Sequence, residues 1–422
     1  MLIRLRKPKV VIRTEWLLDI SMILYITSST WISFLSFLPI SSVWIVSTMI
    51  YGFLFAYCIL KKEVPSWQAI VTILISVILF AYAYFSHPEN RFYFIRETYG
   101  LSRVFRPDRT IYFLIFVSLY RKKPQKLLNT LWVSSVLLCF FGGIDFLQAM
   151  LRGYWLEYDY SGQLTHFSYS LSFGYKMILP CLVFIYSYIK KRNFLNFLFS
   201  IVVFGMIFIG GSRGQLICVA AFICLMLFRY YNMSNDINKC IVLLCLIVFF
   251  ITIGLIGFQN ILNIISNLLE SMGISSRTLD SLLSGNFTDD NSRFLIWERA
   301  INAIKNGDFF GYGVYGDRPI ISSLHYAGYC HNIFLELMVS FGPVTGLLLS
   351  CIMILRSLYI IMIKEDDIWI DLFTIMFAIS IQLLISMSFW YVMGFWGAVE
   401  CSHYCKNRHK KKINIILIKR RL

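Results

Sequence analysis

Long apolar stretches recur along almost the whole chain, and no other feature restricts its fold as strongly. About ten to twelve runs reach the roughly 18 apolar residues that mark a candidate membrane span. The chain has 58% hydrophobic residues and a mean hydropathy of +0.67, whereas soluble domains are nearer ~45–50% apolar. The sequence therefore predicts an all-α fold, a polytopic transmembrane helix bundle.

We expect about twelve spans, an even number that would place both termini in the cytoplasm. The first span follows a basic N-terminus without a small-residue cleavage site, so no cleavable signal peptide is expected. The expected spans lie near residues 16–36, 40–60, 67–86, 107–120, 127–149, 169–189, 193–211, 214–231, 240–258, 332–354, 370–386 and 388–404.

The net charge of +16 is explained by where the lysines stand. Most occupy short segments beside spans, such as Lys61, Lys122 and Lys190, and others lie near the C-terminus. This distribution is typical of positive-inside topology, and the C-terminal lysines can also contact anionic lipid. It argues against nucleic acid as a partner.

Many arginines, in contrast, fall on the expected outer side. Guanidinium groups bind phosphate and carboxylate in a bidentate way, so outer arginine indicates recognition of planar or polyanionic groups. The alternative is that the 87–109 loop lies inside. The outer arginines are Arg91, Arg96, Arg103, Arg106, Arg109, Arg152, Arg213, Arg277, Arg293, Arg299 and Arg318.

The expected organisation has four parts. Residues 1–258 form a transmembrane bundle of about nine spans, and 259–330 form one large extracytoplasmic loop that contains short helices. Residues 331–404 form C-terminal transmembrane helices, and 405–422 form a basic cytoplasmic tail. Loops as long as 259–330 are usually functional or disordered.

Within this loop, "DDNSRFLIWERAINAIKNG" at 289–307 predicts a helix that Asp290, Asn291 or Ser292 can cap and that Gly307 ends. Its apolar stripe consists of Phe294, Trp297, Ile301 and Ile304 at helical spacing.

Two arginines stand at expected helix starts, where free N–H groups and a cationic side chain together favour an anion. Arg213 lies in "GGSRGQ" at 210–215, a tight glycine turn between two spans, and Arg293 begins the loop helix. A simple turn with a snorkelling arginine is an equally good interpretation of the first. "FFGYGVYGDRP" at 309–319 resembles a phosphate-binding loop weakly, and a chain reversal explains its glycines as well.

The third polar element is "AGYCHNIFLELMVSFG" at 327–342, where His331 and Asn332 open an apolar span. Nearby positive charge favours neutral imidazole, which is a competent general base. Glu336 shares a helix face with Asn332 and could serve an acceptor, pair with Lys176 or only satisfy Asn332. Lys176, inside the sixth span, needs a partner such as Glu336 or Asp145.

We expect no metal site and no disulfide framework. The two cysteines and His403 of "CSHYC" at 401–405 lack the two-pair spacing of structural zinc motifs.

Residues 205–350 resemble the O-antigen polymerase and O-antigen ligase superfamily of bacterial envelope glycosyltransferases. The resemblance rests on the order and spacing of short motifs, and "SGQLTHFSYSLSF" at 161–173 is similar to an earlier family element but lacks the Pro-Asn expected after His166. The matching motifs are "GGSRG" at 210–214, "SRFLIWERAINAI" at 292–304, "FFGYGVYG" at 309–316 and "HNIFLELMVSFGPVTG" at 331–346.

The resemblance implies a GT-C-like, inverting enzyme that needs no cofactor, nucleotide sugar or metal. Its substrate would be a polyprenyl-diphosphate-linked oligosaccharide at the outer face of the bacterial cytoplasmic membrane. Arg213 and Arg293 would hold the diphosphate, and His331 would deprotonate or orient the acceptor hydroxyl. Asn332 and Glu336 would orient the imidazole or bind the acceptor glycan. Membrane lipids, a chain-length regulator and a flippase are further implied partners.

Three functions remain open at this stage. A polymerase would join repeat units that are still on lipid, and a ligase would move the glycan to a lipid A core or a protein. A transporter or flippase would predict internal repeats and broken helices near the mid-membrane, which the sequence does not indicate. Aromatic residues in the outer loops suit glycan stacking and modestly favour the polymerase; they are Tyr154, Trp155, Tyr158, Tyr160, Tyr312, Tyr315, Tyr326 and Tyr329.

Overall fold

The computed structural model describes residues 14–96, 99–158, 163–240, 243–244, 248, 257–271, 276–284, 293–324 and 328–405. The chain divides into two compact units, Met1–Pro65 and Ser66–Leu422. Most of the expected span at 240–258, the expected helix cap at 290–292 and the tail residues 406–422 lie outside the described residues.

The first unit is a small helical hairpin. It contains α1 (Glu15–Ile26), α2 (Ser28–Phe34), the 3₁₀ turn η1 (Leu35–Phe37) and α3 (Ser42–Lys61). The Ser21 hydroxyl on α1 donates to the Ile50 carbonyl on α3 at 2.6 Å. The chain bends by 71° between Glu15–Ile26 and Ser28–Phe37, so the expected span at 16–36 is not one straight helix.

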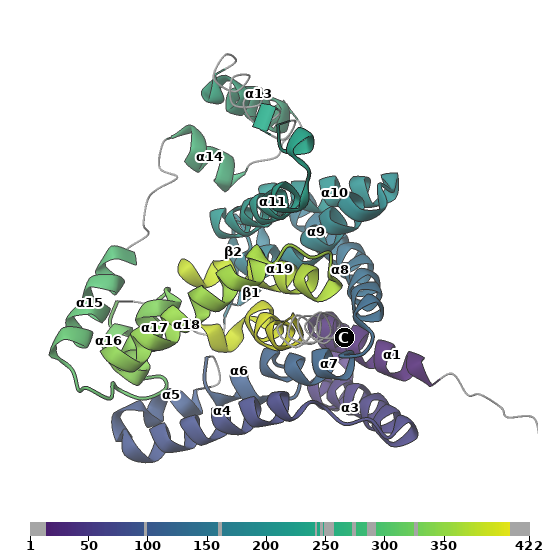
Figure 1. Cartoon of the computed structure of the whole chain (residues 1–422). Coiled ribbons are helices and arrows are strands. Elements are labelled where there is room, and N and C mark those ends of the chain that lie inside the picture. The colour runs from purple at the N-terminus through teal and green to yellow at the C-terminus, as the bar shows by residue number, and fades with distance from the viewer. Residues whose placement is uncertain are drawn as a thin grey trace, which may run out of the picture. The chain divides into compact units, whose positions relative to one another are not determined.

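The second unit is also helical, with one small β-hairpin (Figure 1). Its first half consists of α4 (Trp67–Ser86), η2 (Pro88–Asn90), α5 (Arg91–Ile95), α6 (Leu101–Phe105), η3 (Thr110–Tyr112), α7 (Phe113–Leu119), α8 (Pro124–Arg152), β1 (Trp155–Tyr158), β2 (Leu164–Phe167), α9 (Leu171–Lys191), α10 (Phe194–Gly210) and α11 (Arg213–Met233). Its second half consists of α13 (Phe258–Ser271), α14 (Arg277–Leu283), α15 (Arg293–Asn306), α16 (Asp317–Ile321), α17 (Ile333–Phe341), α18 (Pro343–Met362), α19 (Ile368–Ser380), η5 (Ile381–Leu384), η6 (Phe389–Tyr391) and a helix over 393–405.

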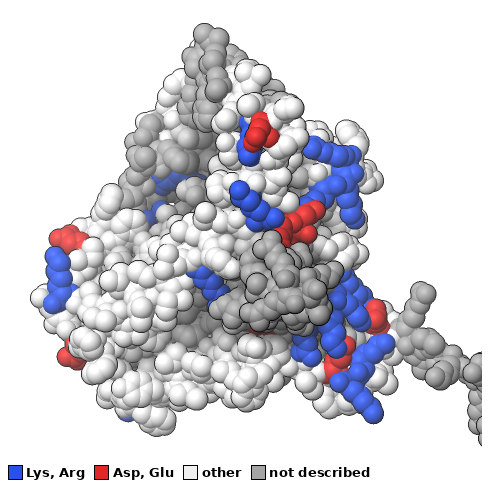
Figure 2. Space-filling view, viewed as in Figure 1, with Lys and Arg blue, Asp and Glu red and all other residues white. Residues whose placement is uncertain are grey.

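The all-helical class is confirmed, whereas the number of twelve spans is not. Among the described residues, six helices are long and apolar enough to cross a membrane, or seven if the bent pair in the first unit counts as one. Two shorter apolar helices cover Phe194–Gly210 and Ile368–Leu384. Figure 2 shows broad areas of the visible face without Lys, Arg, Asp or Glu, as expected where helices contact lipid.

Two further expected spans are interrupted. Residues 107–120 contain only η3 and the short helix α7, and the span at 332–354 is divided into α17 and α18 at Gly342. Gly342 has φ 82°, and an added Cβ would lie 1.9 Å from the Phe309 carbonyl oxygen. The two last spans, 370–386 and 388–404, are separated by non-helical residues 385–388.

Charged residues mark one end of the helices in the second unit. Asp371 of α19 lies 3.3 Å from the Lys190 Nζ of α9 and 3.2 Å from the Arg229 Nη2 of α11. Arg229 is near the C-terminal end of α11, whereas Arg213 begins it, about 24 Å away at 1.5 Å per residue. Arg213 and Lys190 therefore lie at opposite ends of these helices.

Candidate functional site

A break in the apolar C-terminal region organises the candidate site. Between η5, which ends at Leu384, and η6, which begins at Phe389, the chain is not helical. We call Leu384–Ile385–Ser386–Met387–Ser388 the 384–388 segment. Met387 has φ 62°, a conformation that is uncommon for a residue with a side chain. Ser386 and Ser388 of this segment are buried, whereas Leu384 is exposed.

Arg213 begins α11 at a tightly packed turn. Gln215 Oε1 accepts hydrogen bonds from the Ser212 backbone N–H at 2.6 Å and from the Ser212 hydroxyl at 2.8 Å. Gly214 approaches the Tyr175 hydroxyl and Ile385, which would lie 3.0 and 3.4 Å from an added Cβ. The Arg213 turn therefore packs against α9 and the 384–388 segment.

The β-hairpin braces the same turn. The Ser170 amide, just after β2, donates to the Gly210 carbonyl at 3.0 Å, and the Trp155 ring lies against Gly210. Glu157 accepts hydrogen bonds from the hydroxyls of Ser170 and Ser172. His166 is exposed and stacks on Tyr154 with ring centroids 4.0 Å apart.

Arg293 begins α15, which confirms the predicted loop helix, although the predicted apolar stripe is only partly right. Ile296 and Ala300 are buried in a cluster with Ile321, Cys330 and Val339, and Trp297 and Ile304 pack against that cluster. The predicted stripe residues Phe294 and Ile301 are exposed instead. The buried face of α15 therefore contains Ile296 and Ala300, which pack against residues of α16 and α17.

Tyr175 connects the two arginines and the 384–388 segment. Its hydroxyl packs on Gly214, forms a hydrogen bond with Ser386 and lies within electrostatic range of the half-buried Arg293. Nothing in the sequence distinguishes Tyr175, because a single tyrosine in an apolar span is not a motif.

His331 lies just before α17 in a strained conformation. Its φ is 51°, and its ring centroid lies 4.4 Å from that of Tyr329. The Tyr329 hydroxyl approaches the Met387 sulfur at 4.0 Å. Such left-handed residues persist only where the surrounding structure enforces them, and they cluster at functional sites.

Asn332 caps α17 and connects it to the same segment. Its Oδ1 accepts from the backbone amides of Phe334 at 3.0 Å and Leu335 at 3.3 Å. Its Nδ2 donates to the Leu384 carbonyl at 3.4 Å. Four residues thus contact the 384–388 segment: Gly214 of the Arg213 turn, Tyr175, Tyr329 and Asn332. Arg293 is related to the segment indirectly, through its electrostatic interaction with Tyr175.

Glu336 points into a buried charge cluster that it forms with Asp317 and Arg318; the three are 1–2% exposed. Its Oε1 accepts from the Ser388 hydroxyl. Asp317 Oδ2 lies 3.4 Å from Arg318 Nη1, and Arg318 Nη2 donates to the Tyr391 hydroxyl at 3.4 Å. Lys176 instead lies 3.8 Å from Asp145, so the proposed pairing of Glu336 with Lys176 is wrong.

One cation cannot keep both carboxyl groups of this cluster ionised. Burial raises the pKa of Glu336 to about 8, and the negative charge of Asp317 adds to the effect while Arg318 opposes it. Burial also raises the pKa of Asp317, against the opposing charge of Arg318 and the hydrogen bond from the Cys330 amide. Because Asp317 contacts Arg318 directly, Asp317 is the ionised group and Glu336 carries the proton at neutral pH.

Among the aromatic residues proposed for glycan stacking, three of the five whose side chains the structure describes lie inside the protein. Trp155, Tyr315 and Tyr329 are buried, and Tyr312 is fixed by bonds from its amide to Val339 O and from its hydroxyl to Ala303 O. These bonds tie the 309–316 loop to α15 and α17, which supports a chain reversal rather than a phosphate-binding loop. Tyr160 and Tyr326 lie outside the described residues.

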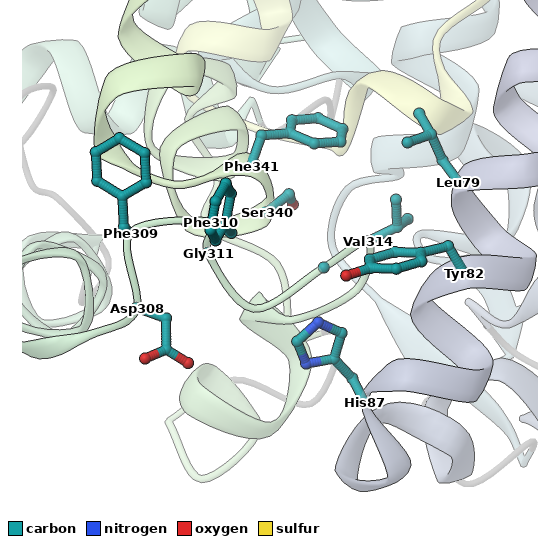
Figure 3. A pocket seen from close by; sticks show the side chains of 11 residues that line it. Leu79, Tyr82, His87, Asp308, Phe309, Phe310, Gly311, Val314, Ser340 and Phe341 are labelled. Carbon is teal, nitrogen blue, oxygen red and sulfur yellow. The ribbon is translucent and has the colours of Figure 1, made fainter.

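A separate pocket of about 460 Å³ opens between the C-terminal end of α4 and the loop before α16. Figure 3 shows Tyr82 and His87 on one side of it, and Asp308, Phe309 and Phe310 on the other. Its lining contains no Arg213, Arg293 or His331 and no other Lys or Arg. It is therefore not the predicted anion site.

Residues 197–350 match the family model described as O-antigen ligase, which supports the resemblance to the O-antigen ligase and polymerase superfamily. The match covers Arg213, Arg293, His331, Asn332 and Glu336. No curated protein and no solved structure matches the chain. Together with the apolar helices, the family match supports a bacterial membrane protein.

Proposed function

We propose, from the match of residues 197–350 to the family model described as O-antigen ligase, that this chain polymerises lipid-diphosphate-linked oligosaccharide repeat units at the outer face of the cytoplasmic membrane. The observation that carries the proposal is that the Arg213 turn and the Tyr329–Asn332 stretch both contact the 384–388 segment, and that Tyr175, hydrogen-bonded to Ser386 of this segment, lies within electrostatic range of Arg293. Two cationic helix starts and an imidazole beside one polar break suit a substrate with a charged leaving group.

The donor diphosphate is held by Arg213 and Arg293. Both begin helices of more than two turns, α11 and α15, so guanidinium and helix N-terminus favour the same anion. Diphosphate departs readily once its charge is met, and fixed cations stabilise the charge that develops on the leaving oxygen. No protein nucleophile is required.

His331 acts as the base toward the acceptor. The imidazole takes the proton of an acceptor hydroxyl, whose oxygen attacks the anomeric carbon as the bond from that carbon to the diphosphate oxygen breaks. Attack opposite the leaving group inverts the anomeric centre. Asn332 holds the stretch that carries His331, and Glu336, inside the charge cluster, supports α17 rather than the acceptor.

The position of Arg213 supports an outer-face site. It lies at the opposite end of α11 from Arg229, which shares Asp371 with Lys190. Lysine-rich ends of spans face the cytoplasm under the positive-inside rule. The Arg213 end of the helix then faces outward.

Purified protein in lipid nanodiscs, given only a lipid-diphosphate repeat unit, tests this function. We expect a ladder of longer lipid-linked chains, lost in Arg293→Ala and in His331→Ala. Arg299→Ala, exposed on the same helix as Arg293, and His166→Ala, exposed on the hairpin, are matched controls that should retain the ladder. A fully active His331→Ala protein would remove the base assignment.

The description of the matching family favours a ligase as the second candidate. A ligase gives no ladder and forms product only after a lipid A core or protein acceptor is added. Movement of the lipid between leaflets without any new glycosidic bond would replace both enzymes with a transporter.

A further inference from the structure

We propose that the ionised carboxylate of Asp317 is a positioning group for His331, which it orients through the backbone of the preceding residue. The inference rests on the proposed role of His331 as the base. Asp317 itself lies inside the protein, at the start of α16, and contacts neither arginine of the anion site in the described residues.

His331 needs such support because its backbone is strained. A φ of 51° is left-handed, a region that residues with a Cβ adopt rarely. A chain released at this point would return to an ordinary conformation and would carry the imidazole with it. The neighbours on both sides of His331 must therefore be anchored.

Asp317 provides the anchor on the N-terminal side. Its Oδ2 accepts a hydrogen bond from the Cys330 backbone N–H at 3.1 Å, and both residues are buried. A hydrogen bond to a charged acceptor is about twice as strong as a neutral one. On the C-terminal side, Asn332 is fixed by its cap of α17.

A second connection runs through side chains. Arg318 pairs with Asp317 and lies over the rings of Tyr315 and Tyr329, at 4.6 and 5.2 Å from their centroids. The Tyr329 ring then contacts the imidazole of His331. The Asp317–Arg318 pair thus supports both the backbone and the ring of the base.

A neutral amide cannot replace the carboxylate fully. Asn at position 317 would still accept from the Cys330 amide, but more weakly, and Arg318 would lose the carboxylate that it contacts directly. Glu336, which accepts from Ser388, would then have to supply the counter-charge that a buried guanidinium needs, so Arg318 and the Tyr329 ring would shift. The loss of kcat should therefore be smaller in Asp317→Asn than in Asp317→Ala.

The test compares Asp317→Ala and Asp317→Asn with wild type and with Asp280→Ala, an exposed aspartate of α14. Steady-state elongation in nanodiscs gives kcat and the KM for the lipid-diphosphate donor. Hydrogen–deuterium exchange gives the protection of amides in residues 328–336, and thermal midpoints report the fold as a whole.

In Asp317→Ala we expect kcat to fall about 10- to 100-fold, the effect of a small misplacement of a catalytic group. The donor KM should change less than about threefold, because the anion site is separate. Exchange in 328–336 should rise, with Asp317→Asn between wild type and Asp317→Ala. Asp280→Ala should match wild type.

Wild-type kcat and wild-type exchange in either Asp317 variant would overturn the proposal. So would a parallel loss of kcat, donor binding and thermal midpoint, which would indicate a general structural role. If Asp317→Ala does not fold, Asp317→Asn decides by the same criteria. If wild type forms no product, the proposed function fails. The amide exchange of residues 328–336 in the Asp317 variants then still decides whether Asp317 positions His331.

Discussion

The Ser388 hydroxyl donates a hydrogen bond to Glu336 Oε1 at 2.5 Å, although 52 residues separate the two in sequence. The bond joins α17 to the end of the 384–388 segment. It also turns the Glu336 carboxyl into the protein, toward Asp317 and Arg318, where its other oxygen has no hydrogen-bond partner among the described residues. Glu336 is thus an element of the support behind His331.

Glu336 should make the stability of the protein depend on pH. Its pKa is about 8 in the folded protein against an ordinary 4.5, so the folded state keeps a proton that the unfolded chain releases. The stabilisation of the folded state by this proton is complete below the ordinary pKa of Glu336 and is lost as the pH rises through 8. Glu336→Gln should remove this fall and be more stable than wild type at pH 8, by an amount on the order of a few kcal/mol.

Thermal midpoints in detergent between pH 5 and pH 8.5 check this. Glu298→Gln, on the exposed face of α15, is the control and should follow the wild-type curve. Parallel curves for Glu336→Gln and wild type would contradict the protonated state of Glu336.

Asn332 should have two separable roles. Asn332→Ala removes the cap of α17 and should cost about 1 kcal/mol, lowering the thermal midpoint by about 2 °C and lowering kcat. Asn332→Asp keeps the capping oxygen but cannot donate to the Leu384 carbonyl. It should retain the thermal midpoint and still lose activity, as measured by chain elongation. Equal activity of Asn332→Asp and wild type would show that the bond to Leu384 is dispensable.

The break between α17 and α18 should tolerate no side chain at Gly342. A Cβ there would overlap the Phe309 carbonyl oxygen, and the backbone at φ 82° and ψ 162° belongs almost only to glycine. Gly342→Ala should cost about 3 kcal/mol or more and reduce the folded yield in size-exclusion chromatography. Gly143→Ala in α8, where an added Cβ meets nothing within 4 Å, should be neutral or slightly stabilising. Similar yields for the two variants would argue against the steric explanation.

Arg213 should not be replaceable by lysine. A guanidinium can hold two diphosphate oxygens at once, whereas an ammonium is a point charge. Arg213→Lys should raise the donor KM about tenfold or more, measured from initial elongation rates against donor concentration. Arg299→Lys serves as the exposed control. A fully active Arg213→Lys protein would argue against a diphosphate clamp.

Patterns within short stretches predicted a good part of this molecule. The apolar runs at 40–60, 67–86 and 127–149 fold as α3, α4 and α8, because a continuous apolar stretch has few alternatives to a helix in lipid. The spacing of apolar residues predicted the helix α15. The order of the motifs that contain Arg213, α15 and His331 predicted that they match one family model together. The faces of α15 were less predictable, since Ala300 and not Ile301 packs against the α16–α17 side.

Local composition determined that this chain is helical, belongs in a membrane and carries arginine and histidine at helix starts. The break between the spans expected at 370–386 and 388–404 was predicted. Tertiary structure alone decided that Gly214, Tyr175 and Asn332 contact the 384–388 segment there, and that Glu336 turns toward Arg318 rather than Lys176. The two polar serines in "LISMS" were the faint sequence signal for that break. The physical reason is that hydropathy depends on neighbours in the chain, whereas the partner of a buried charge is set by which helices meet around it.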